Sequence, residues 1–408
     1  MNVLIINHYA GSLQYGMSYR PYYLAREWVK MGHNVAIIGA SYSHLRNKQP
    51  DSGHEEIDQI QFLWLKTIRY KGNGLGRIIS IIQFVIKLIL SSGKISKKFK
   101  PDVVIASSTY PLDIYPAYLI SKRNKAKLVF ELHDMWPLSP MLIGNYKPYH
   151  PFIWLIQRAE NFACKNSDCY ISLLGNAKDY LIKHGLTGSK FHYVPNGYSF
   201  ENVDSKHEKL PLEHKELLSI LKSKHKLIIG YTGGIAPSNA MKNLVLTAEY
   251  IQDLEAIAFV IVGNGIQKEE LTNLCKIKKL TNVYFLPFIP KSSIPALLEQ
   301  FDILYAGGTK SILHSYGTSY NKIVDYLLAE KPILFAVDEP NSIVERIGCG
   351  WQIEAEDPKK LETAIRQISL LSLEQREMMG RKGREYAIKE LNYHTLASKI
   401  IAAIEEIK

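Results

Sequence analysis

The sequence predicts an α/β protein made of two Rossmann-like, doubly wound domains. Continuous runs of Val, Ile and Leu, each of strand length, alternate with segments of helical periodicity. This alternation is typical of a parallel sheet that is covered by helices on both faces. The pattern occurs twice in a chain of 408 residues, and that length suits two domains better than one.

The first domain is expected over residues 1–204. Its strands are the apolar runs 3–6, 35–38, 62–65, 103–106, 128–131 and 169–173. Amphipathic spacing predicts helices over 22–31 and 151–166. A long helical tail closes the chain, and we expect its last part, residues 390–408, to pack back on this domain.

The second domain is expected over residues 222–389. Its strands are the runs 226–231, 258–262, 283–286, 303–306, 332–336 and 350–353, and its helices are 243–253, 268–278, 294–300, 321–330 and 358–371. The mixed charge of residues 205–221, together with Pro211, indicates a linker region between the two domains.

Charge is distributed unevenly along the chain. Residues 1–200 contain 24 Lys and Arg against 12 Asp and Glu, whereas residues 201–408 contain 26 and 27. The basic first half suggests an anionic partner, either a membrane or a nucleic acid. The four cysteines lack the spacing of a metal site or a disulfide framework, which fits a reducing compartment.

No targeting segment is recognisable at the N-terminus. The chain lacks the basic region and the long apolar region of a signal peptide. No uncharged apolar run reaches the ~18 residues that a transmembrane helix needs. We therefore expect a cytoplasmic protein.

The stretch from Gly317 to Pro332 is the most informative part of the sequence. A small polar turn follows a strand-like run and opens into a helix, where Thr318 and Ser319 can offer backbone N–H groups to an anion. Lys322 adds a positive charge, and Asp325, about one turn further, can accept hydrogen bonds from sugar hydroxyls. This arrangement suits a nucleotide. An ordinary N-capped amphipathic helix with its apolar face in a core would have a similar sequence pattern.

Similar turns follow other predicted strands. Parallel sheets bind ligands at the carboxyl ends of their strands. The first strand of domain one is followed by a loop with Gly16, and the strands of domain two are followed by polar or glycine-rich turns. These turns include Gly233, Gly234, Gly263, Gly265, Phe288 and Ile289. Together they predict a cleft that accepts a diphosphate.

These motifs resemble a known family, the family 4 retaining glycosyltransferases with the two-domain GT-B fold. The resemblance covers nearly the whole chain and is closest to the branch that makes bacterial surface polysaccharides and lipid-linked glycans. It is carried by the following segments: Gly16 and Arg20; Leu24-Ala25; 32–35; Phe130 to Pro137; 194–197; 231–234; Asn239-Ala240; 262–265; and Gly317 to Pro332. It implies two domains facing a cleft, with the donor bound by the second domain.

Two positions depart from the pattern of the wider family. That family has a glutamate pair eight positions apart, and here the second position is Asp325 while the first is Gly317. A lysine that often lies near position 239 is replaced by Asn239. Lys322 supplies the missing charge.

The chemistry expected of these residues is departure of a nucleoside diphosphate. Lys322, the N–H groups of Thr318 and Ser319, and the turn at Gly233 and Gly234 would stabilise the leaving group. Asp325 would hold the ribose. The remaining expected donor contacts are Gly16, Arg20, Asn239, Gly263, Gly265, Phe288, Ile289 and Asn321, with Phe288 and Ile289 at the base. No Asp-x-Asp pair occurs, so we predict no essential metal and no cofactor.

His133 follows a strand of the first domain, and in similar enzymes the equivalent histidine contacts the donor sugar. A core-edge histidine bonded to a backbone carbonyl is the alternative. Asp134 is expected to cap a turn and Trp136 to pack. Arg20 is expected to meet a phosphate of the donor or acceptor, or to form a surface salt bridge. The resemblance implies a reaction on one face of the sugar, in which the leaving phosphate helps to deprotonate the acceptor.

Residues 66–100 form a basic and apolar segment. No acidic residue occurs between Asp58 and Asp102. Within the segment, Arg77 to Ser91 is strongly apolar, with one polar stripe at Ser80, Gln83, Lys87 and Ser91. We expect a helix in a membrane interface, with a buried helix as the alternative. Nucleic acid is not expected, because no recognition fold is visible.

The sequence therefore predicts a retaining glycosyltransferase on the inner face of the cell membrane. Its donor would be a nucleotide sugar, of the UDP-N-acetylhexosamine type, and its acceptor a polyprenyl-diphosphate-linked or polysaccharide glycan. Two alternatives stay open. One is a nucleotide-sugar epimerase of the same fold. The other is a non-catalytic subunit that binds nucleotide sugars.

Overall fold

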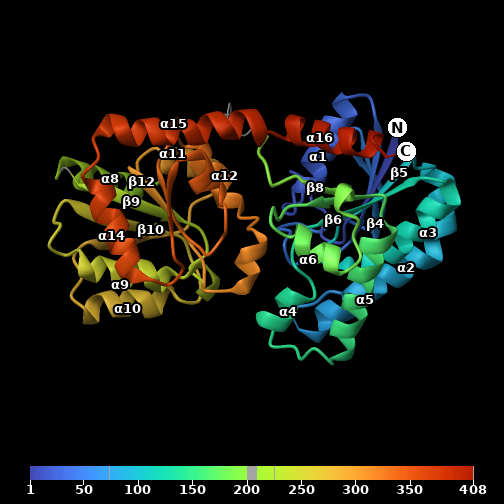
Figure 1. Cartoon of the computed structure of the whole chain (residues 1–408), viewed down its shortest axis with the longest axis horizontal. Helices are drawn as coiled ribbons and strands as arrows, with labels where there is room; N and C mark the ends of the chain where they lie inside the picture. Colours follow the sequence, from blue (N-terminus) through green and yellow to red (C-terminus); the bar gives the residue numbers. More distant parts are fainter. Residues whose placement is uncertain (73, 200–208, 225, 408) are drawn as a thin grey trace. The chain divides into compact units, whose positions relative to one another are not determined.

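The computed structural model describes residues 1–72, 74–199, 209–224 and 226–407. The chain forms two compact α/β units (Figure 1). The first unit comprises Met1–Asn196 together with Tyr393–Lys408, and the second comprises Gly197–Asn392. The predicted fold class is confirmed, because each unit is built on a largely or wholly parallel sheet with helices on both faces.

The first unit contains an eight-stranded sheet of order β3-β4-β2-β1-β5-β6-β7-β8. All neighbouring strands are parallel except β3 and β4. The strands are β1 Asn2–Ile6, β2 Asn34–Ala40, β3 Gly53–Ile57, β4 Ile60–Leu65, β5 Val103–Ala106, β6 Lys127–Leu132, β7 Cys169–Ser172 and β8 Phe191–Tyr193. The chain order reverses between β1 and β5, which is where open α/β sheets bind ligands.

Two layers of helices cover this sheet. Helices α1 (Arg20–Lys30) and α16 (Tyr393–Glu405) pack on one face. Helices α2 (Leu75–Phe99), α3 (Ile114–Asn124) and α5 (Pro151–Asn166) lie side by side on the other. Short elements complete the unit: η1 Pro111–Asp113, α4 Leu138–Leu142, α6 Lys178–Lys183 and η2 Gly188–Lys190.

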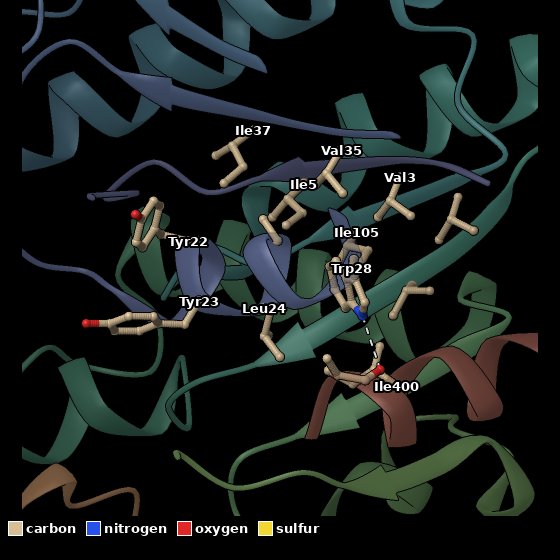
Figure 2. Close-up of a cluster of buried hydrophobic side chains, with 14 of the residues drawn as sticks. Val3, Ile5, Tyr22, Tyr23, Leu24, Trp28, Val35, Ile37, Ile105 and Ile400 are labelled. Atoms are coloured by element: carbon tan, nitrogen blue, oxygen red, sulfur yellow. Dashed lines mark hydrogen bonds between the residues drawn. The ribbon is translucent and has the colours of Figure 1, made fainter. Parts of the chain in front are cut away.

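The C-terminal helix completes the core of the first unit, as predicted. Leu396 and Ile400 of α16 are buried with Val3, Ile5 and Leu24. Figure 2 shows the indole of Trp28 turned toward α16, where its Nε1 donates a hydrogen bond of 3.1 Å to the carbonyl of Ala397. The first unit is therefore assembled from both ends of the chain.

The second unit contains a six-stranded parallel sheet of order β11-β10-β9-β12-β13-β14. Its strands are β9 Leu227–Thr232, β10 Ile257–Val262, β11 Val283–Leu286, β12 Ile303–Gly307, β13 Ile333–Ala336 and β14 Gly350–Ile353. Its helices are α8 Leu212–Ser223, η3 Pro237–Asn239, α9 Met241–Tyr250, α10 Lys268–Ile277, η4 Lys291–Ser293, α11 Ile294–Leu298, η5 Ile312–Tyr316, α12 Asn321–Leu328, α13 Ile343–Ile347, α14 Pro358–Ser369 and α15 Leu373–Glu390. The chain order reverses between β9 and β12.

The structure differs from the sequence-based prediction in the linker region, in the C-terminal tail and in two strands. Part of the predicted linker, and the end of the predicted first domain, lie in residues 200–208, outside the described residues. Residues 212–221 of the predicted linker region belong to helix α8 (Leu212–Ser223), whose Leu218 and Leu221 are buried in the core of the second unit. The C-terminal tail is two helices, of which α15 belongs to the second unit. Polar strand β3 and three-residue strand β8 were not predicted.

Candidate functional site

The reversal point of the second sheet gathers most of the predicted donor residues. The turn at Gly233 and Gly234 follows β9, and both glycines are exposed. The turn from Gly317 to Ser319 lies between β12 and α12. Because β9 and β12 are hydrogen-bonded neighbours, both turns follow adjacent strands at the same edge of the sheet.

Lys322 lies between these turns, and its ammonium group is held in place by two uncharged side chains. Its Nζ donates to Asn239 Oδ1 at 2.9 Å and to the Tyr231 hydroxyl at 3.1 Å, and it lies 4.5 Å from the centre of the Tyr231 ring. Asn239 Nδ2 in turn donates to the carbonyl of Gly234. Burial lowers the pKa of Lys322 from its ordinary value to about 8. Such a lysine is stabilised by an arriving anion.

Asp325 follows Lys322 on the same helix, about one turn along. Within the described part of the chain its carboxylate makes no hydrogen bond, and its side chain is half-buried. Burial raises the pKa of Asp325, an effect that Lys291 opposes. A carboxylate in this state can accept hydrogen bonds from a ligand's hydroxyl groups.

The turn before α12 is held by a residue that sequence reasoning missed. Thr318 Oγ1 donates a hydrogen bond of 2.6 Å to Glu339 Oε2, from the segment after β13. Burial raises the pKa of Glu339, against the lowering effect of the Thr318 bonds. Glu339 follows the predicted strand 332–336, and its position after a strand end could have identified it as a candidate site residue. Ser319 is half-buried, and exposed Asn321 begins α12.

Gly263 and Gly265, predicted as donor contacts, have a packing reason to be glycine. A Cβ at Gly263 would lie 1.9 Å from the carbonyl oxygen of Gly233, and one at Gly265 would lie 2.2 Å from that of Ile235. These glycines allow the turn after β10 to lie against the turn after β9. The two glycines therefore shape the site.

Phe288 and Ile289 follow β11 and differ in exposure. The Phe288 ring is 65% exposed, whereas Ile289 is buried in the core. Phe288 therefore offers an aromatic surface at the edge of the sheet, and Ile289 can offer only its backbone.

In the first unit, predicted residues Arg20 and His133 meet around Glu131 at the end of β6, the strand next to β5. Arg20 Nε donates to Glu131 Oε1 at 3.0 Å, and both side chains are only 4% exposed. Arg20 Nη2 donates to the carbonyl of Val194 at 2.9 Å, and Nη1 donates to that of Pro195. All three guanidinium nitrogens thus have partners inside the protein. This geometry does not support a phosphate contact or a surface salt bridge for Arg20, because the pair is buried.

His133 is oriented by the same carboxylate. Its Nε2 lies 3.0 Å from Glu131 Oε2 and 3.0 Å from Ser107 Oγ, and Ser107 Oγ donates to Glu131 at 2.6 Å. Burial alone would raise the pKa of Glu131, but Arg20 and the other partners hold it well below its ordinary value. An ionised carboxylate only accepts hydrogen bonds, so Nε2 carries a proton, and in the neutral form of an imidazole this tautomer leaves Nδ1 as the acceptor. The alternative of a backbone-bonded histidine is not what the structure contains.

Three other residues of this region have local roles. Asp134 Oδ1 accepts hydrogen bonds from the Met135 N–H and from Ser139 Oγ, which caps the turn after β6. The ring of Trp136 packs beside Tyr110 and Phe152. Gly16 has φ of 103° and lies in a loop that also contacts Arg46. This backbone conformation favours glycine and is sufficient to account for the residue at this position.

His8, next to this network, was not predicted. It is the second residue after β1, is fully buried, and its Nδ1 lies 2.6 Å from the Tyr110 hydroxyl. Burial, together with the charges of Arg46 and Arg77, lowers the pKa of His8 well below its ordinary value. Its position at a strand end could have singled it out. The imidazole of His8 is therefore neutral, and it stacks on the ring of Tyr9.

Helix α2 turns one stripe of apolar residues toward solvent, while Ile81, Phe84 and Leu88 are buried against the protein. The exposed residues lie on one stripe of the helix: Leu75, Ile79, Ile82, Ile86, Ile89 and Leu90. The predicted polar stripe is bonded to the protein instead. Ser80 is buried, the N–H of Ile68 donates to Gln83 Oε1 at 2.8 Å, and Lys87 Nζ donates to the carbonyl of Lys66 at 2.6 Å.

In the described part of the chain, α2 alone is long and apolar enough to cross a membrane. Core helices of soluble proteins pass the same test, so this finding is weak evidence for a span. The described residues contain no group of three His, Cys, Asp or Glu side chains that could hold a metal ion. The expectation of no essential metal stays a prediction.

Comparisons with known proteins agree with this fold. Residues 16–202 match the family described as Glycosyltransferase Family 4, and residues 215–386 match Glycosyl transferases group 1. No curated protein matches the chain.

Three solved structures are similar over nearly the whole chain. HepE of Anabaena, in complex with UDP and glucose, is 14% identical with a TM-score of 0.67 and covers 100% of both chains. Sucrose-phosphate synthase of Thermosynechococcus elongatus is 13% identical with a TM-score of 0.72, covering 99% of this chain and 98% of the other. WaaG, a glycosyltransferase involved in lipopolysaccharide biosynthesis, is 13% identical with a TM-score of 0.64, covering 99% and 100%.

Proposed function

Because the chain is a GT-B glycosyltransferase of the family 4 type, we propose that it moves a sugar from a UDP-sugar donor to a lipid-linked or polysaccharide acceptor, with retention of configuration. We further propose a donor of the N-acetylhexosamine type and a role in bacterial surface-glycan synthesis. HepE binds UDP and glucose, and WaaG acts in lipopolysaccharide biosynthesis. Those statements concern these similar proteins and support the proposal by likeness.

The setting of Lys322 is the observation that carries this proposal. A half-buried lysine with a pKa lowered to about 8 costs free energy unless an anion compensates it. Its Nζ lies beside the exposed turn at Gly233 and Gly234, held by Asn239 and Tyr231. A diphosphate placed there would accept hydrogen bonds from Lys322 and from backbone N–H groups as its negative charge develops.

The other donor contacts follow from this placement. Asp325 would accept hydrogen bonds from the ribose hydroxyls, and the exposed ring of Phe288 would lie against the base. The N–H groups of Thr318 and Ser319 would face the diphosphate, with Glu339 keeping Thr318 in place. No metal ion is required if Lys322 and these N–H groups neutralise the leaving group.

In the first unit we assign the orientation of the donor sugar to His133. Glu131 fixes the ring through Nε2, so Nδ1 would accept a hydrogen bond from a sugar hydroxyl. The acceptor hydroxyl would attack from the face that the diphosphate leaves, and the departing phosphate oxygen would take its proton. This route needs no carboxylate nucleophile.

For the acceptor we propose peripheral contact with the inner face of the cell membrane through residues 66–100. The outward apolar stripe of α2 and the lysines at its C-terminal end support this proposal. A polyprenyl-diphosphate-linked acceptor would be presented by the same membrane.

The test is a screen of UDP-sugars with and without a polyprenyl-diphosphate-linked acceptor. We expect slow release of UDP from one donor without acceptor, faster release with acceptor, and a product whose anomeric proton coupling matches that of the donor. Lys322→Ala should lose most turnover, whereas exposed Lys276→Ala should keep it. An isomerised donor would establish the epimerase instead, and tight UDP binding without turnover would establish the non-catalytic subunit.

A further inference from the structure

A second apolar surface lies on the first unit, in the segment Leu142–Trp154. This segment joins the end of α4 to the first turn of α5. Ile143 is 74% exposed and Tyr149 is 83% exposed, and Leu142 and Trp154 are about half exposed. Side chains of this size scattered singly are normal on a surface, but four within 13 residues of chain form a patch.

The helical face of the first unit that adjoins this patch is basic. Helices α2, α3 and α5 cover the same face of the first sheet and together carry nine Lys and Arg. Their one acidic residue, Glu160, is buried. Between Met135 and Ala159 the chain has no acidic residue, and exposed Lys147 and Arg158 flank the apolar side chains. An anionic surface is therefore the complementary partner.

The segment is close to the start of α2. The guanidinium of Arg77 lies 5.8 Å from the centre of the Trp136 ring, and that ring lies 6.3 Å from the ring of Phe152 in α5. Phe152 is in turn 6.3 Å from the ring of Tyr146. Figure 1 shows α4, the start of α5 and α2 at the same end of the first unit. The apolar stripe of α2 and the segment Leu142–Trp154 thus belong to one region of the surface.

We propose that the segment Leu142–Trp154 inserts its apolar side chains into an anionic lipid bilayer, beside the outward stripe of α2. The composition suits this partner, because Trp and Tyr settle at the level of the headgroups and Lys and Arg bind anionic lipids. A protein partner would not require basic residues on three neighbouring helices. The proposal deepens the membrane contact proposed above and rests on it for the location of the bilayer.

Two contact elements would fix the orientation of the first unit on the bilayer, which one element alone cannot do. A single helix on a bilayer can roll about its long axis, whereas a second contact beside it fixes the orientation of the whole unit. The strand ends that carry Ser107 and His133 would then hold a constant position relative to the lipid headgroups. An acceptor whose diphosphate lies at the headgroups would meet the site in one orientation.

The experiment uses a polarity-sensitive fluorophore on single introduced cysteines. The four native cysteines are buried, and burial raises the pKa of each thiol, so an introduced surface cysteine would be labelled selectively. Ile143→Cys tests the segment and Ile86→Cys tests α2. Leu370→Cys, at an 85% exposed position of the second unit, is the matched control. Each labelled protein is titrated with phosphatidylglycerol vesicles and with phosphatidylcholine vesicles.

We expect a blue shift at positions 143 and 86 with the anionic vesicles, weaker with the neutral ones, and none at position 370. A shift at position 86 without one at 143 would overturn the proposal. So would a shift at 143 that follows protein concentration without vesicles, because a second copy would then cover the patch. The double variant Tyr149→Ser, Trp154→Ser should bind anionic vesicles at least tenfold more weakly while its UDP affinity is unchanged. Since the donor screen needs no vesicles, failure here is distinguishable from failure of the proposed transferase.

Discussion

Replacing Lys322 with Met should have opposite effects on UDP binding and on stability. The methionine keeps the length and the apolar stem of the side chain while it removes the charge. In the free protein, Lys322 Nζ is bonded to Asn239 and Tyr231 but is paired with no carboxylate in the described residues. The charge of Lys322 therefore contributes favourable free energy mainly when an anion is bound.

The effect on stability follows from the pKa of Lys322. Burial lowers that pKa from 10.5 to about 8, so the unfolded state binds the proton more tightly than the folded state. The charge consequently costs stability below pH 8, and the cost disappears as the pH rises from 8 to 10.5. The full shift corresponds to ~3 kcal/mol, and partial exposure with two hydrogen bonds reduces this to ~1–2 kcal/mol. Lys322→Met should raise the melting temperature by a few degrees at pH 7.

The effect on binding has the other sign. A hydrogen bond to a charged group contributes ~1.5–3 kcal/mol, so UDP should bind Lys322→Met roughly 10- to 150-fold more weakly. Titration calorimetry with UDP and a thermal melt without it measure both quantities, with Lys276→Met as control. A UDP Kd within twofold of wild type would refute the assignment of the diphosphate to Lys322. A melting temperature several degrees below wild type would refute the reasoning about its desolvated charge.

Four further predictions follow from the same geometry. Between pH 7 and pH 9 the protonated share of Lys322 falls from ~0.9 to ~0.1, so UDP affinity measured by calorimetry should drop about tenfold; Lys322→Arg should flatten this dependence. Asp325→Ala should weaken UDP at least tenfold yet leave the affinity for 2′,3′-dideoxy-UDP unchanged; equal losses for both ligands would contradict the ribose contact. Glu131→Ala should cost ~3–5 kcal/mol in denaturant unfolding, because Arg20 stays buried without its partner; wild-type stability would show that the pair is dispensable. Gly263→Ala should lower both thermal stability and UDP affinity, since its Cβ would overlap a carbonyl oxygen; normal UDP binding would mean that the turn can move without harm.

The inner strands of the second unit could be predicted because both of their faces are buried in an apolar environment. Strand β10, with the sequence Ile-Ala-Phe-Val-Ile-Val, is buried on both faces, and a continuous apolar run reports that situation directly. Strand β3, with the sequence Gly-His-Glu-Glu-Ile, pairs along one edge of the first sheet and is mostly exposed. Neither apolar content nor alternation distinguishes such a strand from a loop, so it was missed.

Side-chain pairing was harder to predict than position. The sequence placed Lys322 and Asp325 on one helix, because a spacing of three residues is local. The partner of Arg20 is Glu131, more than a hundred residues away, and only the fold brings them together. The orientation of helix α2 was unpredictable for a related reason. Its periodicity identified two faces, but which of them meets the protein depends on bonds from Gln83 and Lys87 to the segment 66–68.

The division of the first unit between the two ends of the chain has a consequence for its synthesis. A ribosome releases residues 1–196 long before it reaches the residues that become α16. Until then one face of the first sheet, around Val3, Ile5 and Trp28, lacks the helix that closes it. The second unit, whose chain is continuous from Gly197 to Asn392, has all its residues earlier than the first. The half that begins the protein is therefore the last to be finished, and a chain that stops before residue 393 would leave it open.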